Sequence, residues 1–123
     1  MDVTKTIEAV LDELGVKRSH LGYAYLVCGI RCAQATPGSR LRLTTDLYPS
    51  IAADLGSSRW QNVERCIRYT VMHTFEYGNL DALTKLFGDI VSLDTGLTTP
   101  GRFISICAVE VGRRIRAQYA GST

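Results

Sequence analysis

The sequence GSSRWQNVERCIRYTVMHTFEYG, residues 56–78, is the stretch that decides the fold. Its apolar side chains recur every three or four positions, which is the period of a helix with one buried face. They are Val63, Ile67, Val71 and Phe75, with Trp60 and Cys66 widening the line. Glycines at both ends mark a turn and a stop, and Ser57–Ser58 supplies an N-cap. We therefore predict one long amphipathic helix over 58–77 with Ser58 as its N-cap.

Helical patterns continue on both sides and are separated by glycine and proline signals. They predict five further helices, at Val3–Leu14, Ser19–Ala35, Leu43–Leu55, Asn79–Phe87 and Pro100–Tyr119. The helix at 19–35 is apolar on more than one side, so we expect it to be central. Pro49 predicts a kink or two short pieces in the third helix. Residues 89–98 form the one real loop, in which a short extended piece fits the sequence. The prediction is an all-α, compact six-helix domain.

A chain of 123 residues fits a single domain, here 1–123 with its core at about 7–118. The net charge of +2 does not by itself indicate a nucleic-acid partner. Eleven of the 14 basic residues are arginine, which suits phosphate and guanine, but genome composition explains the same usage. Without a membrane-spanning run or a signal peptide, we expect a cytoplasmic protein that makes no use of a membrane.

The cysteines and histidines do not predict a metal site, a cofactor or an enzyme. The four cysteines lack a CxxC pair, and the two histidines, His20 and His73, do not cluster with them in the sequence. Cys28 and Cys32 lie four apart, so both can face the core as free thiols. No glycine-rich phosphate loop or nucleophile motif is present, and we interpret His73 as structural.

The polar face of the long helix carries groups that recognise base edges. Arginine pairs with guanine, asparagine with adenine, and glutamate accepts from cytosine. The candidate base-contacting residues are Asn62, Glu64, Arg65, Arg68 and Tyr69. The preceding helix and the turn at Gly56–Ser57 complete a helix-turn-helix, whose second helix enters the major groove. Polar residues on one side are also what any amphipathic surface helix shows, so the spacing alone is a weak signal.

The start of the same helix offers phosphate contacts. Backbone N–H groups at a helix N-terminus favour anions. The candidate phosphate-contacting residues are Ser57, Ser58, Arg59 and Gln61. At the other end of the chain, Arg113, Arg114 and Arg116 suit the helix dipole, and we interpret them as solvated cations.

The chain resembles a known family over roughly residues 7–115. The matching motifs are GYAYL at 22–26, LYPSIA at 47–52, VERCIR at 63–68, GNLD at 78–81 and LFG at 86–88. Together and in this order they resemble the C-terminal effector domain of the stage-zero sporulation response regulator of endospore-forming bacteria. The resemblance implies a six-helix domain without enzymatic activity that binds short DNA boxes, often as tandem copies, and regulates promoters.

The resemblance also implies roles for single residues. It makes the helix with VERCIR the recognition helix and places Asn62, Glu64, Arg65 and Arg68 on the DNA, with Tyr69 at a position that is usually histidine. It implies contact of the segment 76–88 with the RNA polymerase sigma factor. The candidate residues there are Glu76, Asn79, Asp81 and Lys85. The partners expected are therefore double-stranded DNA, the sigma factor and a second copy of the chain on tandem sites, at the nucleoid.

Three departures from the family pattern affect these expectations. Asn62 replaces an arginine, so the preferred DNA sequence differs. The turn at 56–61 is one residue longer and holds the bulky Trp60, which re-aims the start of the helix. No phosphoacceptor receiver domain precedes the matched region in this sequence. We therefore expect DNA binding that is constitutive or controlled by abundance or a partner, in competition with a full-length regulator.

The alternative function is a protein-interaction module of the same fold that modulates a full-length sporulation regulator without recognising DNA. Asn62, Tyr69 and the longer turn favour this alternative. Glu64, Arg65 and Arg68 favour DNA, and a weak salt dependence of binding would count against phosphate contacts.

Overall fold

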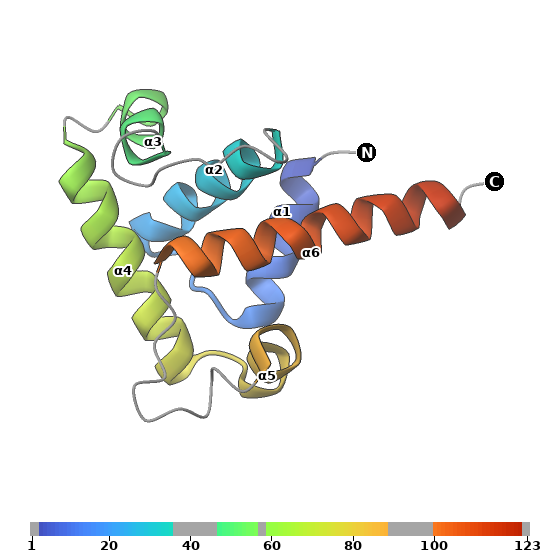
Figure 1. The fold of residues 1–123 in the computed structure, drawn as a ribbon. Helices are drawn as coiled ribbons and strands as arrows, with labels where there is room; N and C mark the ends of the chain where they lie inside the picture. Colours follow the sequence, from blue (N-terminus) through green and yellow to red (C-terminus); the bar gives the residue numbers. More distant parts are fainter. Residues whose placement is uncertain (1–2, 36–46, 57–58, 89–99, 122–123) are drawn as a thin grey trace.

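The computed structural model describes residues 3–35, 47–56, 59–88 and 100–121. These residues form six helices and no strand, in agreement with the all-α prediction (Figure 1). The helices are α1 (Val3–Leu14), α2 (Leu21–Ala35), α3 (Tyr48–Asp54), α4 (Trp60–Tyr77), α5 (Leu80–Phe87) and α6 (Pro100–Gly121). The loop predicted at 89–98 lies outside the described residues. Over the described ranges, no helix combines the length and apolar character that crossing a bilayer requires.

The central helix of the fold is α2, as predicted. It packs against α1, α3, α4 and α6 (Figure 1). Leu26 and Ile30 are fully buried. A Cβ atom at Gly22 would stand 2.2 Å from Thr70 Oγ1 and 2.6 Å from the Cys66 carbonyl oxygen, both on α4. Because only glycine permits this approach, α4 lies directly against the backbone of the central helix.

The third helix is described for the second half of its predicted range. Its described part starts at Tyr48, with Leu47 as N-cap, and Pro49 lies in its first turn. Proline is tolerated there because first-turn N–H groups have no intrahelical acceptor. The helix continues from Pro49 to Asp54, so any kink or break would lie before Pro49. The earlier part of the prediction, 43–46, lies outside the described residues.

The fourth helix begins at Trp60, two residues later than predicted. Arg59 is the N-cap in an extended conformation, and its side chain forms no capping hydrogen bond. Ser57 and Ser58 lie outside the described residues. Trp60 stacks on Tyr48, with ring centroids 6.3 Å apart. This contact joins the first residues of α3 and α4, the two helices of the helix-turn-helix.

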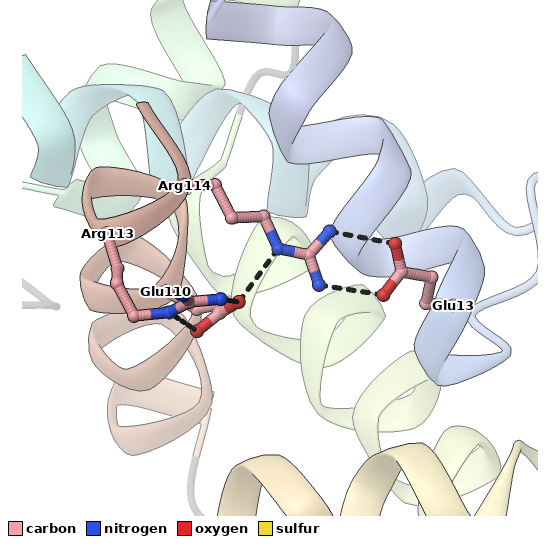
Figure 2. A network of polar contacts seen from close by, with 4 residues as sticks. All are labelled: Glu13, Glu110, Arg113 and Arg114. Atoms are coloured by element: carbon pink, nitrogen blue, oxygen red, sulfur yellow. Dashed lines mark hydrogen bonds and ion pairs between the residues drawn. The ribbon is translucent and has the colours of Figure 1, made fainter. Parts of the chain in front are cut away.

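A charged network ties α1 to α6 (Figure 2). Arg114 donates two hydrogen bonds to the Glu13 carboxylate, at 2.8 and 2.7 Å, and a third to Glu110 at 2.7 Å. Arg113 binds the same Glu110 carboxylate through two hydrogen bonds. The Arg114 side chain is only 27% exposed, so the interpretation of this residue as a solvated terminal cation is wrong.

Of the other predicted helix ends, the start of α2 is two residues later, at Leu21, and α6 runs on to Gly121. The ends marked by caps and turns agree with the structure. Asn79 is the N-cap of α5, and its side chain accepts a hydrogen bond from the Ala82 N–H at 3.2 Å. Pro100 is the first residue of α6. Gly15 follows α1 with φ at +87°, a left-handed conformation that favours glycine. The Asn79 N–H donates to the Leu14 carbonyl at 3.0 Å, so the α4–α5 turn rests on the end of α1.

Candidate nucleic-acid interface

One long face of α4 is exposed along the edge of the molecule. In Figure 1 this helix runs past α2 and α6, which both pack against its inner side. The inward residues are buried, namely Val63, Ile67, Thr70, Val71 and Thr74. The outward residues are exposed, namely Gln61, Asn62, Arg65, Arg68, Tyr69, Met72 and Glu76. Four of the five predicted base-contacting residues therefore share one exposed surface, which we call the α4 outer face.

Arg65 lies at the middle of the α4 outer face, because helical geometry places it between Asn62 and Arg68 around the axis. Its guanidinium has no ion-pair partner among the residues that the structure describes. An exposed arginine without a carboxylate partner keeps its full set of donors for a ligand. Arg65 is thus the cation of this face best prepared to bind an external acceptor.

Glu64 is the one predicted base-contacting residue that is only partly exposed beside the α4 outer face. Its side chain is only 20% exposed and forms an ion pair with Arg68, whose side chain is 62% exposed. The negative charge of Glu64 also acts on the buried Tyr48. Burial first, and the negative charge of Glu64 second, raise the pKa of Tyr48 to about 12. To accept a hydrogen bond from a base, Glu64 must exchange its contact with Arg68.

The start of α4 holds two of the four predicted phosphate-contacting residues. Arg59 and Gln61 are exposed there, while the other two, Ser57 and Ser58, lie outside the described residues. The N–H groups of the first turn point out of a helix along its axis and favour negative charge. The N-cap side chain forms no hydrogen bond to that turn. An anion at this end of α4 would therefore not compete with a cap.

A cluster of aromatic rings beside the outer face was not predicted. The His20 ring, just before α2, lies 4.8 Å from the His73 ring and 5.4 Å from the Tyr69 ring. His73 also packs on Tyr77 at 4.8 Å. Burial first, and the charge of His73 second, lower the pKa of His20. The packing of His73 among these rings supports the structural role predicted for it.

The sequence carries no local signal for that cluster, because α2, α3 and most of α4 lie between His20 and His73 along the chain. Only the packing of α2 on α4 brings them together. A hydrogen-bond contact of 3.5 Å between His20 Nδ1 and Thr70 Oγ1 lies behind the rings. The cluster therefore holds Tyr69 against the N-terminal end of α2 and limits where its ring can point.

The predicted polymerase-contacting residues lie at the other end of the molecule. Asn79, Asp81 and Lys85 are exposed on and before α5. They line a groove of about 560 Å³ between α1, α5 and α6, whose wall includes Glu13 and Arg114 of the charged network (Figure 2). Glu76 is exposed on α4 and does not line this groove. Three of the four residues therefore share one concave surface.

Comparison with known families agrees with this architecture. The family model described as "Sporulation initiation factor Spo0A C terminal" matches residues 7–111. The match covers α2, α3, α4 and α5 completely, α1 from Ile7 onward and about half of α6. The family is one of DNA-binding domains and not of enzymes. The chain belongs to the family of C-terminal, DNA-binding effector domains of the sporulation initiation factor Spo0A.

Proposed function

We propose that this chain is a sequence-specific transcription regulator that inserts the N-terminal half of α4 into the major groove of double-stranded DNA. The observation that carries the proposal is Arg65, exposed at the middle of the α4 outer face without an ion-pair partner in the described residues. A guanidinium in this state can donate both hydrogen bonds to guanine O6 and N7.

The neighbours of Arg65 have separate roles in this proposal. Asn62 lies one turn earlier and contacts an adenine edge, while Tyr69 lies one turn later and packs on a thymine methyl group. Arg68 pairs with Glu64 in the unbound protein and turns to a phosphate or a base on binding. Glu64, then released, accepts from a cytosine amino group.

Phosphate contacts orient the helix without contributing sequence information. Arg59 and Gln61 supply them from exposed positions at the start of α4, and Ser57 and Ser58 complete the set. Each cation that replaces a counterion adds to the salt dependence of binding. Binding of this kind places the protein at the nucleoid.

The direct test is selection of bound sites from a random-sequence duplex pool, followed by affinity measurements of the selected site across salt concentrations. We expect one short box, with affinity that falls steeply as salt rises. Arg65→Ala should flatten the preference at one base pair, by about 1–3 kcal/mol of discrimination. Lys5→Ala is the matched control, because it removes an exposed cation from α1 and should leave the selected sequence unchanged.

We further propose that the groove beside α5 contacts the sigma factor of RNA polymerase through Asn79, Asp81 and Lys85. Glu76, exposed on α4 outside the groove, adds a further contact. The double variant Asp81→Lys, Lys85→Glu reverses both charges and keeps the net charge. It should retain DNA affinity and lose promoter activation in a reconstituted transcription assay. Equal loss of DNA binding would place these residues in the DNA interface instead.

Self-association belongs to the same proposal, as pairing of copies on tandem boxes. Affinity measurements on duplexes with one box and with two correctly spaced boxes distinguish cooperative pairing from independent binding. A second copy that binds more tightly than the first indicates contact between the copies on DNA. Equal affinity for both boxes indicates independent binding.

A protein-interaction module that modulates a full-length regulator is the second candidate. Exposed apolar side chains favour it, because Tyr69, Met72 and Tyr77 stand out along α4. If a folded protein selects no DNA sequence and its binding is insensitive to salt, this second function replaces the first. The same surface would then bind a protein.

A further inference from the structure

Two cysteines of α2 and the last residue of α3 form a compact cluster. Cys28 and Cys32 are four residues apart, so their side chains project from the same face of α2. Asp54 reaches them from α3, and its carboxylate lies 3.7 Å from Cys28 Sγ. The two sulfur atoms and the carboxylate oxygen all lie within 4.8 Å of one another.

These separations match a metal coordination sphere. Zinc–sulfur and zinc–oxygen bonds of about 2.3 and 2.1 Å at tetrahedral angles put sulfur and oxygen about 3.6 Å apart. The distance of 3.7 Å between Cys28 Sγ and the Asp54 carboxylate oxygen already matches this sulfur–oxygen separation to about 0.1 Å. The other two pairs lie within 4.8 Å, so small side-chain rotations can bring them to a similar spacing.

The burial of the three groups gives the cluster an inner wall and an open side. Cys28 is 2% exposed, Cys32 is half-buried and Asp54 is exposed. A metal ion can enter from solvent past Asp54 and reach thiols that face a low-dielectric interior. Three ligands from the described residues leave a fourth tetrahedral position for water.

A disulfide is the other chemistry that two neighbouring cysteines offer, and helix geometry disfavours it here. A disulfide needs Cβ atoms about 3.5–4.5 Å apart. Positions i and i+4 of an intact helix keep their Cβ atoms about 5–6 Å apart. Both cysteines lie inside α2 and are not in a disulfide. The spacing suits two thiolates that share a metal ion better than two sulfur atoms that bond to each other.

We propose that Cys28, Cys32 and Asp54 form a binding site for a thiophilic divalent cation of the zinc type, which ties α3 to α2. Thiolate ligands select such ions over Mg²⁺ and Ca²⁺. On binding, each thiol loses its proton to the buffer, and two metal–sulfur bonds and one metal–oxygen bond form. Because α3 also packs against α4, the ion stabilises the support of the α4 outer face.

The test is titration of the reduced full chain with Co²⁺, whose thiolate complexes absorb in the near ultraviolet. We expect saturation at one ion per chain and loss of the absorption when Zn²⁺ displaces Co²⁺. Removing even an outer partner of a metal ligand costs about 10–100-fold in affinity, so Cys32→Ser and Asp54→Asn should each weaken binding at least tenfold or so. Asp54→Asn should keep the thiolate absorption, while Cys32→Ser should diminish it.

Cys66→Ser is the matched control, because Cys66 is a half-buried cysteine on α4 outside the cluster. It should bind Co²⁺ as the wild type does. A second readout is the melting temperature, which Zn²⁺ should raise in the wild type and in Cys66→Ser, and raise by less in Asp54→Asn because its weakened site still binds. Asp54 is exposed, so its substitution tests the site even if Cys32→Ser does not fold.

Three results would overturn the proposal. The first is a folded wild-type protein with no saturable cobalt absorption. The second is equal loss of binding in Cys66→Ser and Cys32→Ser, which indicates adventitious binding to thiols. The third is unchanged affinity in Asp54→Asn, which removes the carboxylate from the site. None of these results depends on DNA binding by α4.

Discussion

Trp60 stacks on Tyr48 with the two ring planes only 7° apart, and this contact joins the first residue of α4 to the first residue of α3. Tyr48 is buried and Trp60 is half-buried, so the stack closes the edge of the core at this point. The stack therefore holds the first turn of α4 against the first turn of α3. It also sets the direction in which the α4 outer face leaves the body of the protein.

Trp60→Ala should therefore lower both stability and DNA affinity. Loss of a half-buried ring and of its stacking partner costs about 2 kcal/mol in the free energy of unfolding. Urea unfolding followed by far-ultraviolet circular dichroism measures this loss. Trp60→Phe keeps a ring on Tyr48 and should recover most of the stability and of the affinity for the selected box. If Trp60→Ala unfolds like the wild type, the stack does not hold α4.

Arg114 and Arg113 are adjacent in the sequence but should differ in their effect on stability. Arg114 bridges Glu13 and Glu110 from a position that is mostly buried, whereas Arg113 contacts Glu110 with a side chain that is 62% exposed (Figure 2). Arg114→Ala should lower the free energy of unfolding by about 1–3 kcal/mol, because two carboxylates lose their shared partner. Arg113→Ala is the control and should cost less than about 1 kcal/mol. Equal losses in urea unfolding would contradict a clamp between α1 and α6.

The same network makes stability depend on pH in the acid range. Hydrogen bonds from Arg113, and then from Arg114, lower the pKa of Glu110 from 4.5 to about 2. A carboxyl group whose pKa is lower in the folded state stabilises the fold above its unfolded pKa, and this contribution is lost as pH falls towards the folded pKa. We expect the free energy of unfolding to decrease between about pH 5 and pH 2. Glu110→Gln should show a shallower decrease over this window in urea unfolding at stepped pH, and a slope equal to that of the wild type would contradict the assignment.

Local sequence signals were sufficient for the helices and insufficient for the contacts between them. The helix ends marked by Gly15, Asn79 and Pro100 lie where the sequence predicts them, because caps and turns depend on neighbouring residues. The start of α4 was wrong because serine N-cap preference is a local rule, and a tertiary contact of Trp60 overrides it.

Contacts across long sequence separations follow from which helix faces meet. Glu13 and Arg114 are 101 residues apart, and Cys28 and Asp54 are 26 apart. No periodicity within one helix encodes such pairs. For the candidate interface, one-helix geometry predicted the shared face of Asn62, Arg65 and Arg68, but not the partial burial of Glu64, which depends on the packing of α3.

Gly15→Ala should be much more destabilising than Gly56→Ala, although both glycines have positive φ. A Cβ atom at Gly15 would lie 2.7 Å from the Asn79 nitrogen and 2.8 Å from Gly78 Cα, while at Gly56 it would meet nothing within 4 Å. The left-handed conformation alone costs alanine about 1–2 kcal/mol. We expect about that loss for Gly56→Ala and about 3 kcal/mol or more for Gly15→Ala, where backbone must also move. Thermal unfolding of both variants measures the difference, and similar melting temperatures would mean that the α1 end and the α4–α5 turn do not pack as described.

Asn62→Arg should change the DNA sequence that the protein selects. In the family that the chain resembles, an arginine stands at this position, and in the proposed complex Asn62 contacts an adenine edge one turn before Arg65. Arginine prefers guanine at the same groove position, so discrimination at one base pair should shift by about 1–3 kcal/mol towards G·C. Competition between two duplexes that differ only at this pair measures the shift.

Met72→Arg is the control, because it adds the same charge to the same exposed face about 15 Å further along the helix. It should raise overall affinity at low salt and leave the base preference unchanged, since added phosphate attraction carries no sequence information. If Asn62→Arg also raises affinity without altering the preferred base, Asn62 lies beside the backbone rather than over the bases, and Arg65 alone determines the sequence from this end of α4.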